Sequence, residues 1–188
     1  MKKSILTLQF TKWIYFKIFI LFVIMEYQKH FFTDDGTVPN SHLPVILYLQ
    51  VANNSSLSDW FENKLKENNW VNNWRDIVLP YDHFHSNTHE VLALSSGTVS
   101  LKIGGNKGKI FNLSAGDVLI IPGGVGHYSV SNHTNYQFIG GYPDGNDWDL
   151  RTGLPEERPA VLANLAKIII PKTDPIFGEN GHLIDLWK

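Results

Sequence analysis

The chain has 188 residues, 43% of them hydrophobic and 13% aromatic, which is enough for one domain with a substantial core. It contains no cysteine, which excludes a disulfide framework and thiolate metal ligands and agrees with a reducing compartment, so we expect a cytoplasmic protein. Sixteen basic and eighteen acidic residues give a net charge of −2 with no basic stripe, so a nucleic acid is not an expected partner.

Residues 1–24 form an apolar and basic extension that allows three interpretations. A secretory signal would need a small-residue cleavage site, which does not follow. A membrane anchor would need about 20 mostly uninterrupted apolar residues, and Lys12 and Lys17 break the run. The third interpretation is an upstream extension from a misassigned start, because the next methionine is Met25. We favour it and expect one domain over 25–188, with a membrane anchor through 1–24 as the alternative localisation.

The next two elements are a strand and a helix. Residues 45–51 are apolar and predict a short strand, and residues 55–68 carry an apolar face at helical spacing. Ser56 is placed to cap this helix, with Asp59 three positions later in the arrangement of a capping box.

The first block of metal-ligand spacing lies at 83–97. His83 and His85 are two positions apart, so on a strand both point to the same face. Glu90 follows at an odd offset from His85 and would point the other way on an unbroken strand. Turn-forming residues at 86–88 predict a bend that returns the carboxylate to the metal side. From Glu90 on, alternate side chains are then expected to face inward.

A second block follows after a predicted strand at 99–103. Residues 117–121 are a short β-branched run that predicts a buried strand. The glycine-rich turn at 122–126 can reverse the chain sharply. His127 is therefore expected at the start of the returning strand, which continues through 128–131. The stiff turn beside it would hold it in place.

Together the two blocks supply three imidazoles and one carboxylate: His83, His85, Glu90 and His127. This N3O set suits a divalent metal such as Fe, Mn, Co, Ni or Zn, so we predict a site for one such ion. Five further histidines lack a partner at ligand spacing and are expected in surface or supporting roles: His30, His42, His89, His133 and His182. Three tyrosines flank the predicted site, where packing is one interpretation and an acid/base or substrate-orienting role the other: Tyr81, Tyr128 and Tyr142.

Beyond the second block, residues 136–142 and 168–171 are predicted strands, joined through a long loop at 143–159. The part at 141–157 carries Trp148 and several charged residues and is long enough to cover a binding site, although a plain surface loop is the alternative.

The two blocks match the two motifs of the cupin superfamily. Residues 83–97 read H-x-H-x4-E-x6-G, with Ile77 in place of the opening glycine, and residues 116–132 read G-x5-P-x-G-x2-H-x3-S-N, with the final asparagine one place late. The eighteen residues between the motifs resemble the spacing in small single-domain bacterial cupins of the YjlB-like group. Further stretches that look similar to this group are 31–48, 70–74, 141–149 and 171–175. The group brings no settled biochemical assignment with it.

The resemblance implies an all-β fold: a double-sheet antiparallel jelly-roll barrel with one or two short accessory helices and the metal at its mouth. A homodimer is expected by analogy. Four protein ligands on a six-coordinate metal leave two positions for water, substrate or O2. Fe or Mn would resemble cupin dioxygenases and oxalate-acting enzymes, whereas Zn or Ni would favour isomerase or hydrolytic chemistry.

Two functions therefore stay open. The first is a metal-dependent enzyme, dioxygenase- or isomerase-like, acting on a small carbonyl, enol or carboxylate compound. The second is a non-catalytic cupin that binds or senses a small molecule, since a fold alone does not fix a function.

Overall fold

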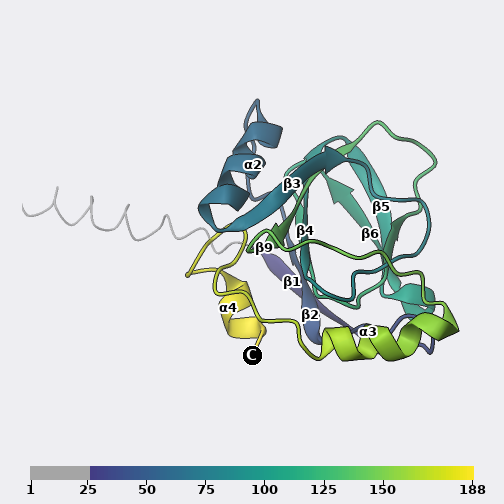
Figure 1. Ribbon diagram of the computed structural model, residues 1–188. Helices are drawn as coiled ribbons and strands as arrows, with labels where there is room; N and C mark the ends of the chain where they lie inside the picture. Colours follow the sequence, from purple (N-terminus) through teal and green to yellow (C-terminus); the bar gives the residue numbers. More distant parts are fainter. Residues whose placement is uncertain (1–25) are drawn as a thin grey trace, which may run out of the picture.

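The computed structural model describes residues 26–188 (Figure 1). Our interpretations of residues 1–24 concern a segment outside this range. Among the helices of residues 26–188, none combines the length and the apolar character that crossing a membrane requires.

Two antiparallel sheets build the fold, and the predicted double-sheet jelly roll is confirmed. The larger sheet has the order β1-β2-β7-β4-β9-β3, and the smaller one has the order β6-β5-β8. The larger sheet consists of β1 (Tyr27–Phe32), β2 (Ser41–Tyr48), β3 (Trp70–Asp76), β4 (Glu90–Ser96), β7 (Val118–Ile121) and β9 (Gln137–Pro143). The smaller sheet consists of β5 (Thr98–Ile103), β6 (Lys109–Ser114) and β8 (His127–Ser129). The helices are α2 (Leu57–Glu67), α3 (Arg158–Leu165) and α4 (His182–Leu186), with short 3-10 turns at Gly105–Lys107 and Pro155–Glu157.

Strand β4 divides the hydrophobic core into two layers. Leu92 and Leu94 face the interior of the barrel, as the alternation from Glu90 predicted. Val91 and Ala93 face outward and pack in the second layer, which α2 and α4 cover. Because successive side chains of a strand point to opposite faces, this division places Glu90 on the interior side.

Strand β2 begins at Ser41, four residues before the predicted strand 45–51. The pairing of β1 with β2 shifts between His30 and Phe32, so that residues 42–44 lie at a bulge. Pro44 belongs to this bulge and therefore removes no hydrogen bond from the ladder. A proline that looks like a strand boundary in the sequence thus lies inside the strand.

The predicted helix at 55–68 is confirmed as α2, but its capping box is not. Ser56 is the N-cap residue and makes no side-chain bond to the helix backbone. Its hydroxyl instead donates to Oδ2 of Asp59 at 2.8 Å. The helix is held by packing, because Phe61 and Leu65 are both buried in the outer layer of the core.

The segment after β9 differs most from the prediction. Residues 168–171 form no strand: the side chain of Ile169 is 82% exposed, and Pro171 has no N–H to donate. The predicted loop 143–159 ends in α3, whose first turn contains a proline, a helix-start signal that the sequence does carry. With α3 and α4 the described residues contain three α-helices rather than one or two.

Candidate metal centre

His83 and His85 lie on an extended segment that precedes β4. His83 bridges to His127, with an N–H···O bond of 2.9 Å from the His127 nitrogen, and Phe84 bridges to Arg151. Phe84 points away from the two histidines into a small buried cluster with Val38 and Val161. The two imidazoles therefore share one face, as their spacing predicted.

The chain bends after His85, and the bend brings Glu90 back to the same side. The bend lies at residues 86–87, and its first residue is anchored to Asp149 through Ser86 N and Ser86 Oγ, both at 2.6 Å. Glu90, the first residue of β4, places its Oε2 atom 3.2 Å from Nε2 of His85 and 3.2 Å from Nε2 of His127.

The glycine-rich turn ties the second motif to the first. Gly124 has a φ of +87° and donates its N–H to the carbonyl of His85 at 2.8 Å. A Cβ at this position would lie 2.7 Å from the carbonyl oxygen of Asn40, so that only glycine fits without a shift. The turn leads directly into His127 at the start of β8.

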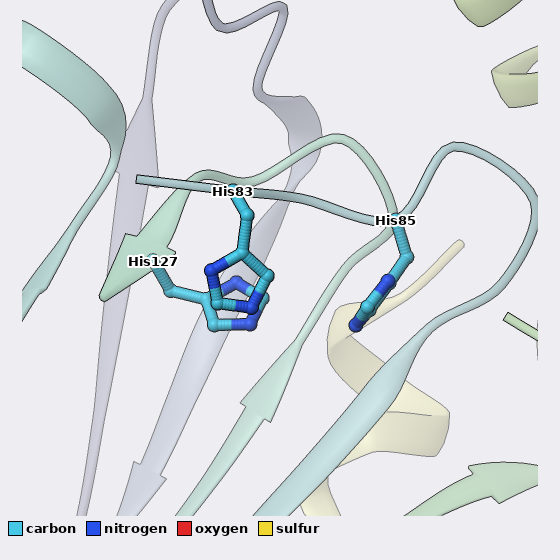
Figure 2. Close-up of side chains that lie close together, drawn as sticks. All are labelled: His83, His85 and His127. Carbon is cyan, nitrogen blue, oxygen red and sulfur yellow. The ribbon is translucent and has the colours of Figure 1, made fainter. Parts of the chain in front are cut away.

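Three imidazoles gather at the barrel mouth (Figure 2). One ring nitrogen from each of His83, His85 and His127 lies within 4.8 Å of the others, a spacing that could hold a metal ion. All three side chains are buried. Glu90 is not part of this three-residue cluster, and its carboxylate lies beside two of the rings.

The orientation of each imidazole is fixed from behind by a backbone carbonyl. Nδ1 of His83 bonds to the backbone carbonyl of Tyr81 at 3.0 Å. Nδ1 of His85 bonds to the backbone carbonyl of Asp149 at 2.5 Å. Nδ1 of His127 bonds to the backbone carbonyl of Val125 at 3.1 Å. A carbonyl oxygen only accepts, so each Nδ1 carries the proton. In the neutral rings, the lone pairs are therefore on the Nε2 atoms. Outer partners of this kind commonly set the tautomer of metal-binding histidines.

Glu90 has one satisfied and one unsatisfied oxygen. Oε1 accepts a hydrogen bond of 2.9 Å from the hydroxyl of Tyr142, which in turn accepts one of 3.0 Å from Nε1 of Trp74. Oε2 of Glu90 and Nε2 of His127 are buried and have no hydrogen-bond partner within residues 26–188. Buried polar atoms without a partner cost free energy, and a cation between these two atoms would satisfy both.

The charges agree with a cation site. Burial, reinforced by the neighbouring His127, lowers the pKa of His83 to about 3 and keeps this ring neutral. Burial disfavours a charged His85, but the Glu90 carboxylate outweighs this effect and raises the pKa of His85. Burial alone would raise the pKa of Glu90, yet His85 and His127 together hold it well below its usual range. Glu90 is therefore ionised, and a cation would offset its charge.

The loop after β9 forms part of the wall above the cluster. Trp148, half-exposed, lies 5.4 Å from the His85 ring between centroids and 6.4 Å from that of Tyr142. Asp149 holds both the bend, through its carboxylate, and His85, through its carbonyl. The predicted covering loop thus contributes to the site, and the role of the Asp149 carbonyl is one that the sequence does not signal.

The cluster lies in a cavity of about 330 Å³. Apolar side chains make up much of its wall: Trp74, Ile77, Val78, Leu79, Leu92, Trp148 and Leu150. Of the three flanking tyrosines, Tyr142 lines the cavity, whereas Tyr81 is 47% exposed and contributes its carbonyl. His89 does not line this cavity, and its side chain is buried rather than at the surface.

The double-sheet jelly roll with this cluster at its mouth defines the chain as a cupin. Uncharacterized protein YjlB of Bacillus subtilis (strain 168) is 36% identical over 163 residues, which cover 86% of this chain and 97% of YjlB. The chain therefore belongs to the family of YjlB-like cupins, as the motifs indicated.

No family model matches the chain. Among solved structures, an oxalate decarboxylase is 22% identical, with 67% of this chain and 33% of that chain covered and a TM-score of 0.38. Pumpkin seed globulin is 18% identical, with 52% and 28% covered and a TM-score of 0.36. This chain thus spans about a third of the length of these proteins, and similarity at this level says nothing about substrate or metal.

Proposed function

We propose that the chain is a metal-dependent enzyme of the cupin type. It binds one divalent cation through His83, His85, Glu90 and His127, and acts on a small carbonyl, enol or carboxylate compound. One observation carries this proposal: three imidazoles have their Nδ1 atoms on backbone carbonyls and direct Nε2 toward one another, beside a carboxylate oxygen that no donor satisfies.

The donor set fits Fe, Mn, Ni or Zn, the borderline ions that imidazole and carboxylate bind together. A cation of this kind supplies Lewis-acid polarisation of a bound oxygen and, for iron or manganese, redox chemistry as well. The protein's own contribution is preorganisation, because the four side chains come from rigid segments. Each is also held by a hydrogen bond on the side that faces away from the cluster.

Tyr142 serves as a fixed hydrogen-bond donor in this proposal. Burial, followed by the charge of Glu90, raises the pKa of Tyr142 far above its usual value, so the hydroxyl keeps its proton. That proton is directed at Oε1 of Glu90, and the hydroxyl oxygen accepts from Trp74. Tyr142 therefore orients the carboxylate, and a base role would require breaking both bonds.

The cavity wall narrows the class of compound. Arg75 is the only Lys or Arg among the described lining residues, and its guanidinium donates to Asp59 at 2.7 Å and to Glu62 at 2.8 Å. No lining cation is therefore available for a second acidic group. The apolar wall favours a compound with one acidic or enolic group, which would lie toward the cluster, and an apolar body.

Metal analysis of the purified full chain tests this function. We expect about one Fe, Mn, Ni or Zn per chain in the parent and in His133→Ala, which changes an exposed histidine. A His85→Ala/His127→Ala variant should lose nearly all of it. Retention of the metal in that variant, or a folded parent that takes up none of the four metals when supplied, would contradict the proposal.

A second candidate is a non-catalytic small-molecule binder. It is favoured by the state of the acid/base groups, because Tyr142 and Oε1 of Glu90 are engaged with each other. Incubating the metal-loaded chain with monocarboxylic, enolic and carbonyl compounds, with and without O2, separates the two. Consumption of a compound that stops in His85→Ala/His127→Ala identifies an enzyme, whereas saturable binding without conversion identifies a binder.

A further inference from the structure

Trp148 is a large aromatic side chain on the wall of the metal-centre cavity, and it is still 47% exposed. Its ring lies nearly parallel to that of Tyr142, with 25° between the two planes, and its centroid is 5.4 Å from that of the His85 imidazole. None of the hydrogen bonds that orient the metal ligands involves the indole. Support of the cluster therefore does not explain why an aromatic ring stands at this position.

One side chain, that of Asn87, holds the backbone on both sides of Trp148. Nδ2 of Asn87 donates to the carbonyl of Asp147 at 3.0 Å, and Oδ1 accepts the N–H of Asp149, also at 3.0 Å. Asn87 belongs to the bend of the first motif, between its histidines and its carboxylate. The segment that supplies three of the proposed metal ligands thus also fixes the position of the indole relative to them.

These contacts make Trp148 a preformed part of the wall rather than a mobile cover. The Asn87 bonds hold the peptide groups on either side of it, and three residues further on Arg151 exchanges two backbone bonds of 3.0 Å with Phe84. A tryptophan side chain has only two torsion angles of its own, so ordering it against a ligand costs little conformational entropy.

The aromatic part of the wall lies beside the metal cluster. The rings of Tyr142 and Trp148 are 5.9 and 5.4 Å from that of His85 between centroids, and aliphatic side chains such as Ile77 and Leu79 also line the cavity. A molecule whose head group binds at the cluster would therefore have its body next to the indole. Aromatic rings attract each other beyond the area that they bury, which corresponds to about 2- to 10-fold in affinity. A saturated ring of the same size lacks this gain.

We propose that Trp148 determines the specificity of the metal centre, which takes an aromatic or conjugated carboxylate, enol or carbonyl compound. The head group binds at the cluster, and the flat, unsaturated body stacks on the indole, which Asn87 positions. This inference rests on the proposed function, because the head group is bound by the cation. It adds to that function a choice between flat and saturated bodies.

Two pairs of probes, matched in head group, test the preference. Benzoate and cyclohexanecarboxylate are titrated into the full chain loaded with Zn²⁺, which is diamagnetic. Benzyl alcohol and cyclohexylmethanol, which are neutral and need no cation, are titrated into the chain after treatment with a chelator. The shift of the Asp149 amide resonance in the ¹⁵N–¹H spectrum reports binding beside Trp148. We expect the aromatic member of each pair to bind about 2- to 10-fold more tightly, although the saturated member buries as much apolar surface.

Trp148→Leu and Trp148→Phe are matched variants, because both shorten the side chain and only the second keeps an aromatic ring. The preference should vanish in Trp148→Leu and persist in Trp148→Phe, and elemental analysis should find the same metal content in both as in the parent. In Asn87→Ala the indole is present but no longer held, so the preference should be smaller than in the parent.

Three results overturn the proposal: a parent that binds neither member of either pair, saturated probes that bind as tightly as aromatic ones in both pairs, or a preference that persists in Trp148→Leu. A failure of the proposed function would look different. A preference shown by the alcohols alone, in a chain that takes up no metal, would uphold the role of Trp148 and contradict the cation-bound head group.

Discussion

The hydroxyl of Tyr142 donates a hydrogen bond of 2.9 Å to Oε1 of Glu90, between two strands that are neighbours in the larger sheet. Trp74, on the strand beyond, donates to the same hydroxyl at 3.0 Å. Three strands thus cooperate to hold one carboxylate oxygen, and the other oxygen is left 3.2 Å from His85 and from His127. The sheet itself aims the carboxylate at the three imidazoles.

Removing the Tyr142 hydroxyl should therefore weaken metal binding without abolishing it. In Tyr142→Phe the ring still packs, but Glu90 loses the donor that fixes its rotation, and outer partners of this kind are typically worth about 10–100-fold in metal affinity. Competition with a chromophoric chelator measures the affinity. Tyr81→Phe is the control, because Tyr81 meets His83 through its carbonyl and its ring, and the variant keeps both. Equal affinities in the two variants would show that the hydrogen bond to Glu90 does not support the site.

Asp149 links the covering loop to both the bend and the metal centre. Replacing it with alanine removes the bonds to Ser86 N, Ser86 Oγ and Arg151 Nε. We expect faster hydrogen exchange at the Ser86 amide and about tenfold weaker metal binding, because the carbonyl that orients His85 is no longer anchored. Asp147→Ala, at an exposed side chain two residues away, should match the parent in both measurements. Unchanged exchange at Ser86 in Asp149→Ala would refute this role.

Metal should stabilise the folded chain. At a free metal concentration about 100-fold above the dissociation constant, the free energy of unfolding should rise by about 2.7 kcal/mol if the unfolded chain does not bind the ion. Urea denaturation with and without a chelator measures this difference. His83→Ala should lose most of it while remaining folded in the absence of metal. A metal-induced gain of the same size in the parent and in His83→Ala would mean that the ion binds elsewhere.

The sequence predicted those parts of the site that depend on local spacing. The parity of His83 and His85, the bend before Glu90 and the glycine-rich turn before His127 all follow from residues within about ten positions of one another, and all are present. The hydrogen bonds that orient these side chains were not predicted, because their partners lie far away in the sequence. The Asp149 carbonyl meets His85 across 64 positions, and Trp74 meets Tyr142 across 68. A backbone carbonyl, moreover, belongs to every residue type and leaves no trace in a sequence.

The errors in the predicted fold have a similar origin. Residues 168–171 carry a run of isoleucines, which by composition resembles a buried strand. No strand edge is paired with them, and the backbone follows the outside of the barrel after α3. The early start of β2 depends on the bulge that contains Pro44, which is a property of the pairing with β1 and not of either strand alone.

Tyr48 offers a test of the fold away from the metal centre. Its hydroxyl donates to Oδ2 of the fully buried Asp174 at 2.6 Å and accepts the N–H of His182 at 3.0 Å. Burial, followed by the charge of Asp174, raises the pKa of Tyr48 far above its ordinary value of 10.0. Tyr48→Phe should cost about 1–3 kcal/mol of unfolding free energy at neutral pH, because a buried carboxylate loses a donor.

The cost should change with pH in a defined direction. Above about pH 10 the unfolded chain releases the Tyr48 proton while the folded chain retains it, so the unfolded state binds fewer protons and stability falls as pH rises. The contribution of Tyr48 is thus fully present below about pH 10 and is lost above it. Urea denaturation at intervals from about pH 8 to about pH 11 measures the free energy of unfolding of the parent and of Tyr48→Phe. The difference between these two free energies should shrink only above about pH 10. A difference that stays constant over this range would show that the hydroxyl of Tyr48 ionises as easily in the folded chain as in the unfolded one.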